Sequence, residues 1–138
     1  MQRTFGLCSL LILICALSVR AEARSRQSFN WGWRFARFGA MPDGTTKAEP
    51  DGLEKVQSDD TDWRQLNLPH DWAIEGPFRE DLPNRTGKLP YEGIGWYRKT
   101  FAVPASDKGK KIFFDIDGAM SRCKVYINGE YAGEWPYG

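Results

Sequence analysis

The sequence predicts an all-β fold, an antiparallel β-sandwich or jelly roll. Polar and apolar residues alternate in four short runs, at residues 29–38, 95–103, 112–117 and 123–127. Gly, Pro, Asp and Asn residues that favour turns separate these runs. No stretch of ten residues has a helical period. Short alternating strands between turns are typical of sandwiches and jelly rolls.

Residues 1–23 have the features of a secretory signal peptide. Arg3 supplies a positive charge, residues 7–19 are apolar apart from two serines, and Ala21-Glu22-Ala23 is a small-x-small cleavage site. The apolar run is shorter than a membrane span requires. We therefore expect a secreted or periplasmic domain of residues 24–138 with no stable membrane span. An uncleaved anchor is the alternative.

The expected mature domain carries no net charge and one cysteine. Loss of Arg3, Arg20 and Glu22 reduces 19 basic and 18 acidic residues to 17 of each. This balance gives no reason to expect nucleic acid as a partner. Cys123 is the cysteine that stays, so no internal disulfide can form. One His and one Cys are too few for a zinc site, and we expect neither metal nor cofactor.

The first half of the domain contains one clear strand and a long loop. Alternation at residues 29–38 predicts a strand whose inner face carries Phe29, Trp31, Trp33 and Phe35. Residues 39–61 are rich in turn-forming residues, which predicts a surface loop with a brief helical turn near 53–56. Residues 59–64 resemble a turn capped by an Asp or Thr side chain. Residues 65–68 form a short strand that Pro69 ends.

The second half contains a further loop, two more strands and a β-hairpin. A polar loop runs to Pro90, and the glycine-rich residues 91–94 lead into a strand at 95–103, which Pro104 ends. A strand is expected at 112–117, where Ile112, Phe114 and Ile116 share a face. Asn128-Gly129 favours a type I′ hairpin turn, because both residues tolerate positive φ.

The segment Pro69-His70-Asp71-Trp72 places an imidazole, a carboxylate and an indole together after a strand. A nucleophilic triad would need a serine or cysteine in an elbow, and no Gly-x-Ser-x-Gly occurs. Two interpretations stay open. Either His70 and Asp71 hydrogen-bond backbone at a tight turn while Trp72 packs, or they form a polar rim beside an aromatic platform.

Aromatic residues make up 14% of the chain, which suits both core packing and sugar binding. The residues expected in the core are Trp31, Trp33, Phe35, Phe101 and Phe114. The residues beside loops, which are freer to contact a carbohydrate, are Trp72, Tyr91, Glu92 and Trp96.

Residues from about 29 to 138 resemble the N-terminal sugar-binding domain of family 2 glycoside hydrolases, the β-galactosidase and β-glucuronidase group. Five segments carry the resemblance, in the family's order and spacing. They are WGWRF at 31–35, WRQLNLPHDW at 63–72, GIGWYRKTF at 93–101, FDIDGA at 114–119 and VYINGEYAG at 125–133.

The resemblance implies a galactose-binding-like jelly roll, incomplete at the C-terminus, at the head of a longer retaining enzyme. The two catalytic glutamates of that enzyme would lie in a TIM barrel beyond this chain, so no catalytic residue is expected here. The expected partners are the remaining domains and a β-galactoside-like carbohydrate. The expected substrate-binding residues are Asp71, Trp72, Tyr91 and Glu92. A free-standing secreted carbohydrate-binding or adhesion module is the alternative.

Overall fold

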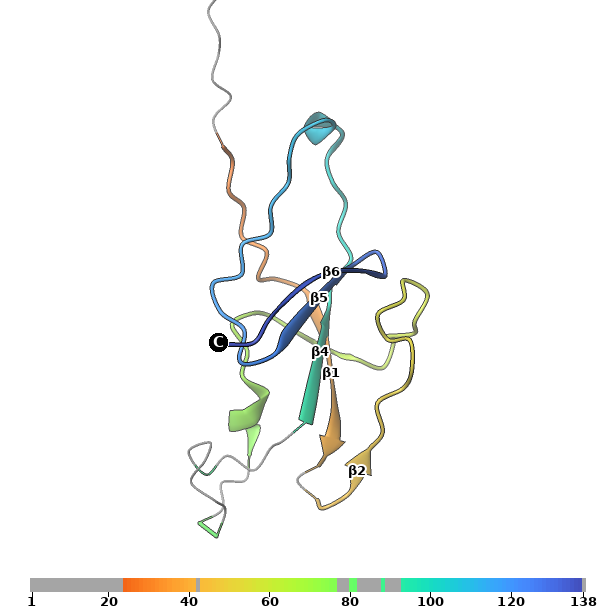
Figure 1. Cartoon of the computed structure of the whole chain (residues 1–138), viewed down its shortest axis with the longest axis vertical. Coiled ribbons are helices and arrows are strands. Elements are labelled where there is room, and N and C mark those ends of the chain that lie inside the picture. Colours follow the sequence, from red (N-terminus) through yellow and green to blue (C-terminus); the bar gives the residue numbers. More distant parts are fainter. Residues whose placement is uncertain (1–23, 42, 77–79, 82–87, 89–92, 138) are drawn as a thin grey trace, which may run out of the picture.

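The computed structural model describes residues 24–41, 43–76, 80–81, 88 and 93–137 (Figure 1). Within these residues the secondary structure consists of β-strands and two short 3-10 turns, and every paired strand is antiparallel. The predicted all-β, antiparallel fold is therefore confirmed. The jelly-roll arrangement stays a prediction. The predicted signal peptide lies outside the described residues.

Strand β1 (Trp33–Ala40) is the centre of the main sheet. One of its edges pairs with β2 (Thr46–Lys47) and β3 (Arg64–Leu66), and the other edge pairs with β4 (Gly93–Arg98). Phe35 is the Cα partner of Arg64 on one side and of Tyr97 on the other. Paired residues share a face of the sheet, so these three side chains form a row across three strands.

Both faces of β1 are covered. Phe35 and Ala36 are each less than a tenth exposed, and adjacent residues of a strand point to opposite faces. Ala36 and Phe38 pack with Leu53, and Trp63 and Trp96 lie against this cluster. The predicted aromatic inner face is confirmed at Phe35, and the opposite face, with Ala36 and Phe38, is covered as well. Trp31, at 65% exposed, is outside the core, because β1 begins only at Trp33.

The predicted surface loop of residues 39–61 contributes to the core through Leu53. Arg98 of β4 holds this loop: it donates to the carbonyl oxygens of Ser58, at 2.8 Å, and of Leu53. Its guanidinium lies 3.6 Å from the Asp60 carboxylate. The loop has few ladder partners, so a guanidinium with five donors satisfies its carbonyl groups. The predicted capped turn is confirmed, since Asp59 accepts from the Thr61 amide at 3.0 Å.

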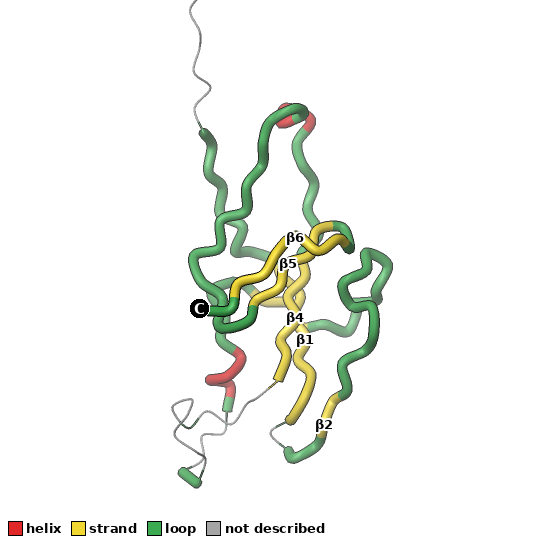
Figure 2. Tube along the Cα trace, in the orientation of Figure 1, coloured by secondary structure: helices red, strands yellow, loops and turns green. Residues whose placement is uncertain are grey.

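One predicted strand is shorter than expected and another is wrong. Strand β4 ends at Arg98 rather than Val103, and residues 112–117 adopt no strand conformation. Figure 2 shows both segments as loops, joined through the 3-10 turn η2 (Ala105–Asp107). Alternation marks a segment suited to a pleated sheet, but a strand also needs backbone pairing, and no strand of the described part of the chain pairs with these segments. Phe101 and Phe114, expected in the core, are exposed as a result.

The predicted hairpin is confirmed by β5 (Cys123–Ile127) and β6 (Glu130–Trp135). Asn128 and Gly129 have φ values of 53° and 86°, as a type I′ turn requires. A register shift follows Val125. The hairpin lies against the main sheet (Figure 1). Tyr126 of the hairpin stacks on Trp96 of β4, with ring centroids 6.0 Å apart. No helix long and apolar enough to cross a membrane occurs among the residues that the structure describes.

Candidate functional site

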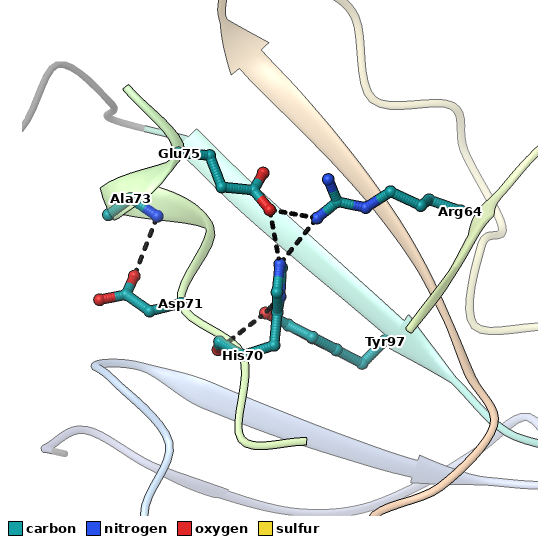
Figure 3. Close-up of polar contacts among 6 residues, drawn as sticks. All are labelled: Arg64, His70, Asp71, Ala73, Glu75 and Tyr97. Atoms are coloured by element: carbon teal, nitrogen blue, oxygen red, sulfur yellow. Dashed lines mark hydrogen bonds and ion pairs between the residues drawn. The ribbon is translucent and has the colours of Figure 1, made fainter. Parts of the chain in front are cut away.

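Four polar side chains meet where the chain leaves β3 and enters the 3-10 turn η1 (Trp72–Glu75), as Figure 3 shows. His70 Nδ1 lies 2.8 Å from Tyr97 Oη, and His70 Nε2 lies 2.9 Å from Glu75 Oε1. Arg64 Nη2 donates to the same Glu75 oxygen. We call Arg64, His70, Glu75 and Tyr97 the His70 network. It links β3, η1 and β4.

The donors in the His70 network follow from the chemistry of its groups. A carboxylate only accepts, so Arg64 Nη2 and His70 Nε2 both donate to Glu75 Oε1. The two nitrogens approach to 2.7 Å because they converge on one oxygen. With Nε2 donating, the neutral imidazole leaves Nδ1 as an acceptor. The Tyr97 hydroxyl therefore donates to Nδ1.

Phe35 forms the apolar floor of the network. Its ring lies 4.8 Å from the His70 ring and 4.8 Å from the Tyr97 ring, and the Arg64 guanidinium lies 5.4 Å away. The His70 side chain is 13% exposed. Burial raises the pKa of Tyr97 to about 12, and the negative charges of Asp71 and Glu75 act in the same direction. Tyr97 is therefore a stable hydroxyl donor at neutral pH.

The pKa of Glu75 is shifted in the opposite direction, below its ordinary value. Burial by itself raises its pKa, but hydrogen bonds from Arg64 and His70, together with the Arg64 charge, lower the pKa overall. Tyr97, His70 and Glu75 follow one another like the nucleophile, base and acid of a catalytic triad. A phenol with a pKa near 12 is a poor nucleophile at neutral pH. These three residues are suited to holding η1 in place, and we assign a catalytic role to none of them.

Asp71 and Trp72 both lie at this site. Asp71 is the N-cap of η1, and its Oδ1 accepts from the Ala73 amide at 2.9 Å. The interpretation that Asp71 hydrogen-bonds backbone at a turn is thus confirmed. The same interpretation is wrong for the His70 ring, whose nitrogens meet side chains. Trp72 packs on β4 at Gly95, where an added Cβ would lie 2.7 Å from Trp72 Nε1.

The other residues predicted to contact a carbohydrate are Tyr91, Glu92 and Trp96. Tyr91 and Glu92 lie outside the described residues. Trp96 is not free to contact a ligand, because it packs against the core, stacks on Tyr126 and donates from Nε1 to Glu49 Oε1 at 2.5 Å. Metal binding finds no support in the described part of the chain, where no three His, Cys, Asp or Glu residues gather to hold an ion.

Sequence reasoning missed Arg64, Glu75 and Tyr97 as members of the site. The alternating pattern after Gly95 correctly places Tyr97 on the opposite face from Trp96, but it gives no partner for the hydroxyl. The pairing of Phe35 with both Arg64 and Tyr97 is the signal that joins them, and it depends on strand register.

The Gly95→Ala substitution is expected to destabilise the site by about 1–3 kcal/mol, because the new methyl group overpacks it. The added Cβ would lie 2.7 Å from Trp72 Nε1 and 3.2 Å from Phe35 Cε2, so the indole must move. The thermal unfolding midpoint measures the effect. Gly118→Ala is the matched control, since nothing lies within 4 Å of its added Cβ. Equal midpoints for the two variants would contradict the packing of Trp72 on Gly95.

The Glu75 carboxylate is expected to stabilise the fold in a pH-dependent way. Its folded-state pKa is below the ordinary value of 4.5, so the unfolded state binds more protons as the pH falls. The stabilisation is complete above about pH 4.5 and is lost as the pH falls through the folded-state pKa. Unfolding midpoints of Glu75→Gln and the unmodified protein should therefore converge in acid. If the difference between the two unfolding midpoints stays constant down to about pH 3, the Arg64–Glu75 ion pair does not supply this stabilisation. Glu130→Gln, an exposed carboxylate in β6, is the control.

The chain has informative relatives, although no family model matches it. It is 44% identical over 126 residues to a β-galactosidase of Bacteroides ovatus, a match that covers 90% of this chain and 14% of that protein. The crystal structure of a β-glycosidase from Bacteroides vulgatus matches 80% of this chain and 13% of its own, with 36% identity and a TM-score of 0.64.

A glycosyl hydrolase family 2 member from Bacteroides cellulosilyticus also matches, with 32% identity and a TM-score of 0.55, over 81% of this chain and 14% of its own. The chain thus spans about one seventh of the length of the proteins that it matches. The sequence match covers 90% of this chain and the two structural matches cover 80% and 81% of it, so both kinds of comparison include most of its residues. In sequence and in structure, the chain is therefore similar to one part of family 2 glycoside hydrolases.

Proposed function

We propose that this chain is the N-terminal, substrate-shaping domain of a longer, exported, retaining glycoside hydrolase that acts on β-galactosides. The observation that supports the proposal is 44% identity, over 90% of the chain, to a protein named as a β-galactosidase. The chain corresponds to 14% of that protein. The catalytic glutamates would lie in the remainder, and this domain would shape the pocket without performing the chemistry.

The apolar surface of the domain supports the existence of a covering partner. Phe113 is 82% exposed, and further large apolar side chains of the same region are exposed with it, namely Phe101, Val103, Ile112 and Ile116. Monomeric proteins seldom expose apolar residues in such density. Because the matched enzymes are about seven times longer than their matched part, we assign this surface to the remaining domains of the parent protein.

Carbohydrate contact is proposed for Asp71 and Trp72, together with Tyr91 and Glu92. Asp71 is exposed beside the partly buried indole of Trp72 at the start of η1. An indole face packs against the C–H groups of a pyranose, and a carboxylate accepts hydrogen bonds from its hydroxyl groups. The Asp71 carboxylate and the Trp72 indole are therefore suited to contact the same pyranose ring.

The substrate class is tested by assaying the full-length protein on nitrophenyl β-galactoside and nitrophenyl β-glucuronide. The proposal predicts turnover of the galactoside, with the β-anomer as the first product in the proton NMR spectrum. Turnover of the glucuronide alone would show that the proposed substrate class is wrong. Turnover of neither compound would refute the proposed glycosidase activity. Export is tested separately, by N-terminal sequencing of the protein outside the cytoplasm, which should begin at Arg24.

A further inference from the structure

His70 touches three elements of the site through its ring. Its Nδ1 meets Tyr97 of β4 at 2.8 Å, and its Nε2 meets Glu75 of η1 at 2.9 Å. Its edge packs on Phe35 of β1, with centroids 4.8 Å apart. Figure 3 shows the imidazole standing between the Tyr97 hydroxyl and the Glu75 carboxylate. One side chain thus fixes the position of η1 relative to both strands.

The turn η1 depends on such attachments. It has four residues and no buried residue. A single turn of this length is not stable by itself in water, because nucleation is unfavourable. The contacts that place it are the His70 network and the packing of Trp72 on Gly95.

The hydrogen bonds of His70 bear on substrate binding because of the order of residues in the chain. His70 directly precedes Asp71 and Trp72, and Glu75 follows them after two residues. The two hydrogen bonds of His70 therefore hold the backbone on either side of both proposed sugar contacts. A displacement of about 1 Å in a substrate-contacting group is enough to weaken binding or catalysis severely.

We propose that His70, held between Tyr97 and Glu75, is a positioning residue that sets the place of Asp71 and Trp72 for the glycoside. This inference rests on the proposed function. The Tyr97 hydroxyl acts through His70, and it does not touch the substrate.

The test is made on the full-length protein with Tyr97→Phe, which removes only the hydroxyl. The expected result is a KM for nitrophenyl β-galactoside raised about fivefold, as loss of one hydrogen bond implies, with kcat changed less than about twofold. Tyr126→Phe removes a hydroxyl from the hairpin and should leave both constants unchanged. Unchanged KM in Tyr97→Phe, or equal changes in both variants, would overturn the inference.

Two conservative replacements of His70 separate its two bonds. His70→Asn places an amide near the position of Nδ1 and retains a partner for Tyr97, whereas His70→Gln reaches toward Glu75. Adding Tyr97→Phe to His70→Gln should change KM by less than about twofold, since that hydrogen bond is already absent. Adding it to His70→Asn should raise KM again. Equal further increases in the two backgrounds would refute the role of the Tyr97–His70 bond.

Hydrogen exchange distinguishes failure of this inference from failure of the proposed function. Amides of η1 should exchange about fivefold faster in Tyr97→Phe than in Tyr126→Phe, whether or not the protein hydrolyses a galactoside. If the unmodified protein does not hydrolyse the galactoside but the exchange difference is present, the proposed substrate is wrong. The placement of η1 by His70 is then still supported. Equal exchange in both variants would refute that placement, even in an active enzyme.

Discussion

Replacing Phe35 with alanine is expected to lower the free energy of unfolding by about 3–5 kcal/mol. Phe35 is 5% exposed, and its ring supports His70, Tyr97 and the Arg64 guanidinium at once. Its loss leaves a cavity beneath the whole His70 network. Hydrogen exchange of the β1 and β4 amides in the full-length protein measures this free energy.

The control for Phe35→Ala is Val56→Ala, which truncates a side chain that is 70% exposed. A surface truncation of this kind changes stability by no more than about 0.5 kcal/mol. Comparable protection of β1 amides in the two variants would mean that Phe35 is not the support of this face.

Replacing Arg98 with methionine is expected to cost about 2–4 kcal/mol, because it leaves partly buried acceptors without donors. The methionine retains most of the apolar stem and removes the guanidinium. The Ser58 and Leu53 carbonyl groups then lose their partner, and Asp60 loses a cation at 3.6 Å. Limited proteolysis should cut the variant within residues 51–61 faster than it cuts the unmodified protein.

Lys55→Met is the matched control for Arg98→Met, because Lys55 is an exposed cation in the same loop. Its replacement should change stability by at most about 0.5 kcal/mol and leave the cleavage rate unchanged. Equal cleavage of the two variants would show that the loop is held by Leu53 packing without the guanidinium.

Local chemistry made part of the fold predictable. The hairpin at Asn128-Gly129 follows from the positive φ that these two residues tolerate, and no distant contact is needed. The turn after Asp59 and the N-cap at Asp71 are likewise short-range hydrogen bonds. By contrast, alternation at residues 112–117 predicted a strand wrongly, since the pattern reports a suitable surface and not the presence of a partner strand.

Contacts that depend on register could not be predicted. His70 meets Tyr97 across 27 residues, and Phe35 aligns Arg64 with Tyr97 only through the pairing of β1 with two strands. Leu53 is one of a few scattered apolar residues in a mainly polar loop, without a periodic pattern to mark it as core. Arg98, which ties this loop to β4, is likewise distant in sequence.

The central claim, that this domain supports a glycoside hydrolase without carrying its catalytic groups, has one direct test. Hydrolysis of nitrophenyl β-galactoside is measured for the chain of residues 24–138 and for the full-length protein at equal molar concentration. The claim predicts turnover by the full-length protein and none above a buffer blank by residues 24–138. Turnover by residues 24–138 alone would contradict it.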